Sequence, residues 1–148
     1  MSNMEESLKL ENQLCFPLYA CSKEVIKKYK PILDKLDLTY TQYITMMVLW
    51  EYGNINVKSL GDMLFLDSGT LTPLLKKLEN KGYITRSRNT NDERNLVISI
   101  TEDGKKLKSK AKYVPGEIGK CINLTSSEAK ELYRLLYKVL DKVDDKHV

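Results

Sequence analysis

The feature that most constrains this chain is a change of hydrophobic period near its middle. Before residue 82 apolar residues recur every three or four positions, as on one face of a helix. The clearest run is Leu71, Leu74, Leu75 and Leu78. After Gly82 the period is two, through segment 83–88 and again at Leu96, Ile98 and Ile100. Residues 89–95 between these segments are wholly polar. The sequence therefore predicts helices followed by a β-hairpin with a charged tip.

End signals divide the helical part. Thr39 and Gln42 have capping-box spacing, and Gly53 is expected to end the helix that they start. A polar turn then leads to a short helix capped by Asn56, and a third helix follows residues 67–69 and ends at Gly82. A last helix is predicted to begin at the second capping box, in residues 125–128.

The segment 8–36 is predicted to form one or two helices. Pro17 marks either a helix start just after Cys15 or a kink, and the sequence leaves both open. Pro31 is a second interruption. The helical segments and the one hairpin together predict a mainly α fold with a small β wing.

Composition indicates a globular protein without a membrane span. The chain has 148 residues, 42% of them hydrophobic and 30% charged. No stretch approaches the roughly 18 uninterrupted apolar residues of a spanning helix. The N-terminus lacks the basic start and apolar run of a secretory signal, so we expect a cytoplasmic protein.

Two helices followed by a hairpin is the order of a winged helix-turn-helix, whose second helix enters the major groove of DNA. We therefore expect double-stranded DNA as a partner. Small polar residues at the start of that helix are expected to approach bases and phosphates: Ser68, Gly69, Thr70 and Thr72. Basic residues suited to phosphate contacts follow: Lys76, Lys77 and Lys81. Arg86 is a further residue expected to bind DNA. At the wing tip Arg94 is expected to reach the minor groove, with Asp92 holding it.

The sequence LDSGTLTPLLKKLE at residues 66–79, with DER at 92–94, resembles the MarR superfamily of repressors. QLCF at 13–16, YKP at 29–31 and LTY at 38–40 resemble its organic hydroperoxide-sensing, OhrR-type branch. The resemblance runs from about residue 8 to residue 143. It implies a single domain over 1–148, in which about 39–100 bind DNA while about 8–36 and 101–146 form a homodimer. It also implies an operator with inverted half-sites.

The same resemblance assigns a sensor to the chain. Cys15 matches the cysteine that an organic hydroperoxide oxidises, which releases the repressor from DNA. Tyr29 and Tyr40 match tyrosines whose hydroxyls bond that sulfur from the other subunit, with Tyr19 nearby. The chemistry is consistent, since only a thiolate attacks a peroxide and donors directed at sulfur favour the charged form. The apolar neighbour Phe16 favours an oxidant with an alkyl part.

The other cysteines leave a choice open. Some relatives carry a second cysteine that resolves the oxidised sensor, and Cys121 lies in the corresponding region. It is either that residue or a passive thiol, in which case a low-molecular-weight thiol is the expected resolving partner. Cys21 is six residues after Cys15, on another side of a helix, and is expected to be structural.

Inventory argues against catalysis and metal binding. The only histidine, His147, is next to the C-terminus, so no Cys/His couple is available, and no cysteines have the spacing of zinc ligands. We expect no enzyme, cofactor or metal. Four alternatives remain: a repressor that answers to a phenolic or other small ligand, a sensor of another electrophile, a thiol peroxidase and a winged protein-interaction module.

Overall fold

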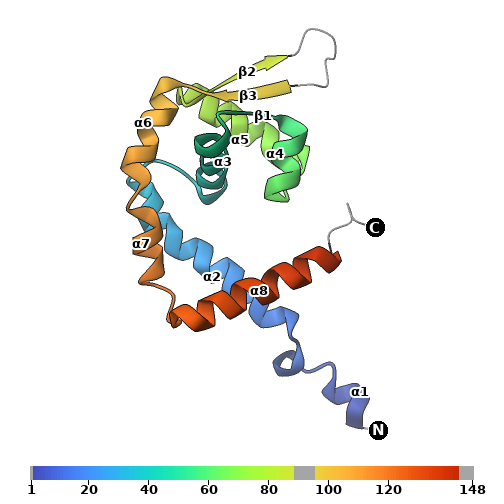
Figure 1. Ribbon diagram of the computed structural model, residues 1–148. Helices are drawn as coiled ribbons and strands as arrows, with labels where there is room; N and C mark the ends of the chain where they lie inside the picture. The colour runs from blue at the N-terminus through green and yellow to red at the C-terminus, as the bar shows by residue number, and fades with distance from the viewer. Residues whose placement is uncertain (1, 89–95, 144–148) are drawn as a thin grey trace. The chain divides into compact units, whose positions relative to one another are not determined.

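A computed structural model describes residues 2–88 and 96–143 (Figure 1). The chain forms two compact units, Met1–Ile118 and Gly119–Val148, which are described separately. The wing-tip residues Asp92 and Arg94 lie outside the described residues. The elements of the first unit are α1 (Ser2–Glu6), the 3-10 helix η1 (Leu10–Asn12), α2 (Cys15–Asp34), α3 (Tyr40–Tyr52), β1 (Asn54–Asn56), α4 (Val57–Leu64), α5 (Ser68–Asn80), β2 (Ile84–Arg88), β3 (Leu96–Ile100), α6 (Glu102–Ala111) and α7 (Val114–Gly119), which runs to the boundary.

The predicted hairpin is confirmed, but it belongs to a larger sheet. β2 and β3 pair antiparallel, with Ile84 opposite Ile100. β1 adds a third antiparallel strand in the order β1-β3-β2, with Asn54 opposite Ser99 (Figure 1). The sequence prediction of a plain turn over residues 54–56 was therefore wrong. The strand exists because the backbone of β3 offers hydrogen bonds from more than 40 residues away, which local sequence does not reveal.

The predicted caps of the middle helices are confirmed. The Thr39 hydroxyl accepts from the Gln42 amide, and the Gln42 side chain accepts from the Thr39 amide. Gly53 ends α3 with φ 77°, and Gly82 follows α5 with φ 84°; both angles lie in the left-handed half of backbone space, which favours glycine. Asn56 accepts from the Lys58 amide at the start of α4. Local chemistry thus sets where these helices begin and end.

The core of the first unit lies between α3, α5 and the sheet. Its fully buried side chains include Met46, Leu49, Leu60, Leu75, Leu78, Ile84 and Ile98. The Trp50 indole donates a hydrogen bond to the Gly104 carbonyl at 2.9 Å and so joins α3 to α6. A mainly α fold with a small antiparallel sheet is confirmed.

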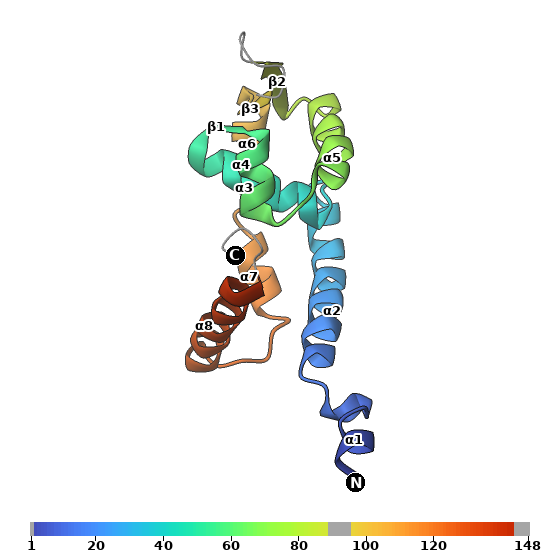
Figure 2. The same ribbon diagram turned by 90° about the vertical axis from the view of Figure 1, so that its right-hand side faces the viewer.

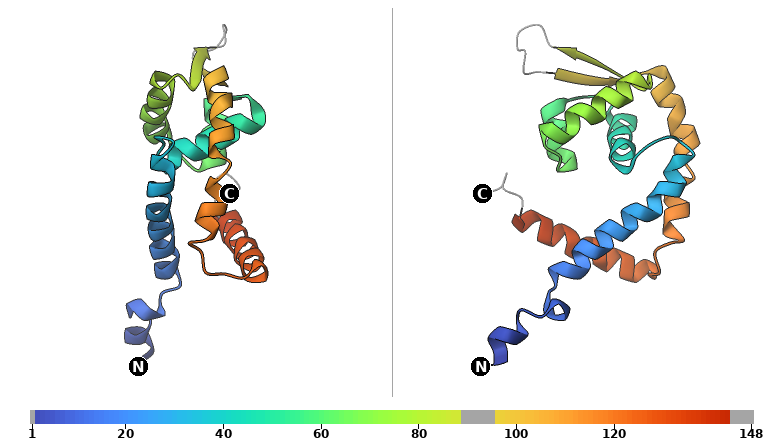
Figure 3. Two further views of the ribbon diagram at one scale, coloured as in Figure 1. Left: turned by 90° about the vertical axis from the view of Figure 1, so that its left-hand side faces the viewer. Right: turned by 180° about the vertical axis from the view of Figure 1, so that it is seen from behind.

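α2 is one continuous helix, which settles the role of Pro17. The helix begins at Cys15, so Pro17 lies in its first turn, where a missing amide costs nothing. Pro31 lies inside the helix, close to its C-terminal end. That end packs on the core through Leu33, whereas the first turns extend away from α3 and are exposed (Figures 2 and 3). α2 therefore places Cys15 far from the core of its own unit.

The second unit is built on α8 (Ser126–Val143). The predicted capping box is present, since the Thr125 hydroxyl accepts from the Glu128 amide and the Glu128 carboxylate from the Thr125 amide. One stripe of the helix carries half-exposed apolar side chains: Leu132, Leu135, Leu136 and Val139. In residues 2–88 and 96–143, no helix is both long and apolar enough to cross a bilayer.

Candidate functional site

The first turn of α5 presents small polar residues to solvent. The Asp67 carboxylate caps the helix by accepting a hydrogen bond from the Thr70 amide at 2.8 Å, and this bond lowers the pKa of Asp67. Ser68, Gly69, Thr70 and Thr72 are all exposed. Small side chains at the positive end of a helix leave room for phosphate oxygens and base edges. This turn has the surface that a DNA-reading helix requires.

The opposite face of α5 is buried and fixes the orientation of the helix. Leu71 and Leu75 are almost fully buried against the core. With that face inside, Lys76 and Lys77 lie on the outward face and are exposed. Exposed ammonium groups on the helix that presents the polar first turn are placed to neutralise phosphates.

Arg86 of β2 is bonded to α5, the helix that is expected to enter the major groove and is called the recognition helix below. Its guanidinium donates two hydrogen bonds to one carboxylate oxygen of Glu79 in α5, at 2.9 and 3.2 Å. These bonds lower the pKa of Glu79. The Arg86 side chain is only 24% exposed. The pair therefore ties the base of the wing to α5, and a direct contact between Arg86 and DNA stays a prediction.

Cys15 is the first residue of α2 and carries an exposed free thiol. Apolar side chains surround it in sequence and are exposed as well: Leu14, Phe16, Leu18 and Tyr19. The Phe16 and Tyr19 rings are 6.4 Å apart between centroids. The thiol thus lies in an apolar, unburied patch at the positive end of a helix dipole.

Tyr29 and Tyr40 lie together at the other end of α2. Their ring centroids are 4.8 Å apart, and Tyr43 is 6.0 Å from Tyr29. Burial raises the pKa of Tyr29, and the neighbouring hydroxyls of Tyr40 and Tyr43 raise it further. Burial also raises the pKa of Tyr40. Both phenols are therefore protonated near neutral pH and can donate hydrogen bonds.

The thiol and the tyrosine pair are far apart within one chain. Cys15 and Tyr29 are 14 residues apart on the same helix, which corresponds to about 21 Å at 1.5 Å per residue. A hydrogen bond between them inside one chain is excluded by this distance.

Two comparisons decide the family. A family model described as transcriptional regulator SarA/Rot matches residues 27–111. The organic hydroperoxide resistance transcriptional regulator of Bacillus subtilis (strain 168) is 49% identical over 147 residues, which cover 99% of this chain and 100% of that protein. The chain belongs to the organic hydroperoxide-sensing branch of the MarR superfamily. It is a transcriptional regulator with a winged helix-turn-helix and not an enzyme, as its sequence predicts.

Solved structures of the MarR superfamily agree with this assignment. Reduced AbfR bound to DNA superposes with a TM-score of 0.78 at 33% identity, covering 97% of this chain and 100% of that one. AbfR is a protein of Staphylococcus epidermidis. Its disulfide-formed structure matches with a TM-score of 0.64 at 35% identity, covering 95% of this chain and 99% of that one.

The structure brings together some of the residues expected of a MarR-type regulator. The first turn of α5 and its two lysines form one surface, and Tyr29 and Tyr40 form one cluster. Cys21 and Cys121 are both exposed. Cys121 lies in the second unit.

Sequence reasoning missed Tyr43 and the capping role of Asp67. Asp67 carried a readable signal, because aspartate directly before a helix start is a preferred cap. Tyr43 had no such signal in the sequence, since it lies in an apolar run and its contact with Tyr29 depends on how α2 packs on α3.

Proposed function

We propose that this regulator represses transcription in the reduced state and leaves its operator when an organic hydroperoxide oxidises Cys15. The observation that carries the proposal is the placement of an exposed thiol in an apolar patch at the start of α2, about 21 Å along that helix from Tyr29, whose ring packs against that of Tyr40 in α3. At that distance the phenols cannot bond to the thiol of their own chain. The spacing therefore suits a sensor in which the phenols of a second copy contact the thiol.

A homodimer follows from the exposed apolar side chains. The first turns of α2 expose Leu14, Phe16 and Leu18, and α8 exposes the stripe that includes Leu132 and Leu136. Exposed apolar patches mark interaction surfaces, since water contact with them is unfavourable. We assign segments 8–36 and 101–146 to the dimer contact and 39–100 to DNA. In the dimer, Cys15 of each copy meets Tyr29 and Tyr40 of the other, with Tyr19 one turn away from the thiol.

The chemistry requires no cofactor. The Cys15 thiolate attacks one oxygen of the hydroperoxide; an S–O bond forms, the O–O bond breaks, and the departing alkoxide takes a proton to leave as an alcohol. Sulfur is oxidised to the sulfenic acid, and the peroxide is reduced. The sulfenic acid then condenses with a thiol and releases water, which gives a disulfide. That thiol is either Cys121 or a low-molecular-weight thiol.

Release from DNA follows from the lost contacts. A phenol that donates to a thiolate has a different partner once the sulfur carries oxygen or a second sulfur. The two winged parts read inverted half-sites, so a change in their relative placement lowers affinity for both. A coupling of about 1–3 kcal/mol changes affinity about 5–150-fold, which is enough for a switch. We place this repressor in the cytoplasm, on a gene whose product removes peroxides.

The test is operator binding by wild-type, Cys15→Ser and Cys21→Ser proteins, with and without an organic hydroperoxide. We expect reduced wild-type to bind, and oxidised wild-type to bind at least about fivefold more weakly. Cys15→Ser is expected to bind and to ignore peroxide, whereas Cys21→Ser behaves as wild-type. Wild-type protein that keeps its affinity after measured oxidation of Cys15 contradicts the proposal.

The resolving thiol needs a separate measurement. Peroxide-treated protein is analysed by mass spectrometry without reductant, alone and with a small thiol. A Cys15–Cys121 disulfide in the protein alone supports Cys121 as the resolving residue. A mixed disulfide on Cys15 as the sole product assigns that role to the small thiol.

A further inference from the structure

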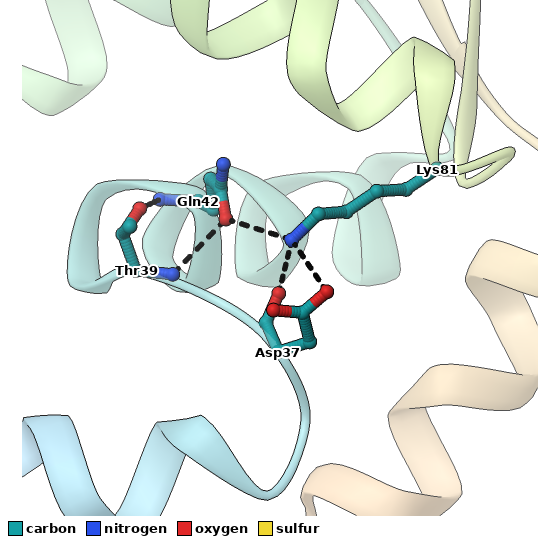
Figure 4. A network of polar contacts seen from close by, with 4 residues as sticks. All are labelled: Asp37, Thr39, Gln42 and Lys81. Carbon is teal, nitrogen blue, oxygen red and sulfur yellow. Dashed lines mark hydrogen bonds and ion pairs between the residues drawn. The ribbon is translucent and has the colours of Figure 1, made fainter.

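Lys81 caps the C-terminal end of α5, and its ammonium group is bonded to Asp37 of the same chain. It donates to the Asp37 carbonyl oxygen, lies 3.4 Å from the Asp37 carboxylate and is 3.5 Å from the Gln42 side-chain oxygen (Figure 4). The Lys81 side chain is 27% exposed, whereas that of Asp37 is 92% exposed. The sequence assigned Lys81 to phosphate contacts; the structure instead directs it toward the corner between α2 and α3.

The ammonium group of Lys81 stabilises the backbone conformation of the corner between α2 and α3, residues 37–42. Asp37 has φ 54°, an uncommon conformation for a residue other than glycine. Gln42 is buried, and the oxygen that faces Lys81 also accepts the Thr39 amide at 3.0 Å, closing the capping box of α3 (Figure 4). Lys81 therefore contacts the same atoms that set the direction in which α3 begins.

The start of α3 carries the sensor tyrosine. Tyr40 is its first residue and directly follows Thr39, while its ring packs against Tyr29. A displacement of Tyr40 moves the capping box, and the box is bonded through Gln42 to Lys81, the C-cap residue of α5. α5 has 13 residues, so it is a rigid rod of about 20 Å with DNA-facing residues at its far end.

We infer that Lys81 is a positioning residue, which couples the tyrosine pair to the recognition helix through Asp37 and Gln42. This inference rests on the proposed redox switch. A lysine at a helix C-terminus also stabilises the helix dipole, and a purely structural Lys81 does only that. The two roles differ in a measurable quantity. Loss of a structural contact lowers stability alone, whereas loss of a coupling residue lowers the ratio of oxidised to reduced operator Kd.

The first measurement is that ratio in wild-type, Lys81→Met, Lys81→Gln and Lys81→Arg proteins. Both removal variants are expected to lower it about fivefold, since a hydrogen bond to a charged group is lost from a partly exposed site. Lys81→Arg keeps a cation with several donors and is expected to restore most of the ratio. Lys77→Met is the matched control on the same helix; it is expected to weaken binding equally in both redox states and to leave the ratio unchanged.

The second measurement does not involve peroxide. Coupling is reciprocal, so operator bound at α5 must stabilise the corner of residues 37–42 through Lys81. Hydrogen exchange of the amides in this segment is followed with and without operator DNA. We expect the DNA to slow exchange in wild-type and Lys81→Arg proteins, and to have a smaller effect in Lys81→Met at equal saturation with DNA.

The outcomes separate the two proposals. If wild-type ignores peroxide while DNA slows exchange only where position 81 is cationic, the redox switch fails and the coupling stands. If wild-type responds to peroxide but Lys81→Met and Lys81→Gln keep its ratio and its exchange pattern, the role of Lys81 is overturned. A lower melting temperature with an unchanged ratio also overturns it, because that is the result of a structural contact alone.

Discussion

Gly61 in α4 is the position where one added methyl group tests how the helix-turn-helix is packed. A Cβ at Gly61 would lie 2.8 Å from the Leu66 carbonyl oxygen and 2.9 Å from Leu71 Cδ1. Leu66 precedes α5, and Leu71 is a buried residue of its first turn. Both contacts are much shorter than ordinary van der Waals distances, so α4 and the start of α5 must separate by about 0.5 Å to accept alanine.

The change in the free energy of unfolding caused by Gly61→Ala is the difference between two opposing effects. Alanine in a helix interior is favoured over glycine by about 1 kcal/mol. Overpacking a tight contact costs about 1–3 kcal/mol, and here both neighbours are backbone or core. We therefore expect Gly61→Ala to lower the free energy of unfolding by about 1 kcal/mol, and by about 2 kcal/mol at most. Because the first turn of α5 must move, operator affinity should fall as well.

Gly116 in α7 is the matched control. A Cβ there meets nothing within 4 Å, so Gly116→Ala is expected to raise stability by about 0.5–1 kcal/mol through helix preference alone. Urea unfolding of both variants, followed by circular dichroism, measures the two shifts, and a gel-shift titration gives the operator Kd. If Gly61→Ala is stabilised as much as Gly116→Ala and binds operator normally, the packing argument is wrong.

Three further substitutions test the contacts around the site. Trp50→Phe removes the donor to the Gly104 carbonyl and is expected to cost about 1 kcal/mol in urea unfolding. Burial raises the pKa of Tyr43, so its pKa in the folded protein lies above the unfolded value of about 10. The free energy of unfolding should therefore fall as the pH rises above about 10. Tyr43→Phe should make this decrease smaller in thermal melts recorded over a series of pH values. Glu79→Gln weakens the bond to Arg86 and is expected to lower operator affinity by loosening the wing; higher affinity would instead mean that Arg86 binds DNA when released.

Sequence predicted the parts of this fold that depend on neighbours in the chain. The capping boxes at Thr39 and Thr125 and the glycine after α5 are local, since each bond joins residues a few positions apart. The strand β1 was not predictable in this way. Its three residues are too few to show alternation, and they become a strand only because β3 runs beside them.

The candidate site divides along the same line. The polar first turn of α5 was readable from sequence, because helix position alone makes those residues exposed. The contacts of Arg86 and Lys81 were not readable from sequence, since a basic residue near a DNA-facing helix bonds either to phosphate or to the protein. Here Glu79 lies close enough to bind Arg86, and Asp37 lies close enough to bind Lys81. Which partner a cation takes depends on tertiary distances of a few ångströms, and periodicity does not contain them.

The length of α2 joins the two halves of the proposed mechanism. Cys15 and Tyr29 are fixed about 21 Å apart on one rigid helix, so the proposed sensor is complete only when a second copy supplies the tyrosines. The operator with inverted half-sites also requires two copies. In the proposed mechanism, oxidation and DNA reading are thus properties of the same dimer. Under this proposal, a change at the sulfur of one copy acts first on Tyr40 of the other. Tyr40 begins α3, which is bonded through Gln42 to Lys81 at the end of that copy's own α5. The proposal therefore predicts that one oxidised sulfur disturbs the half-site held by the opposite copy.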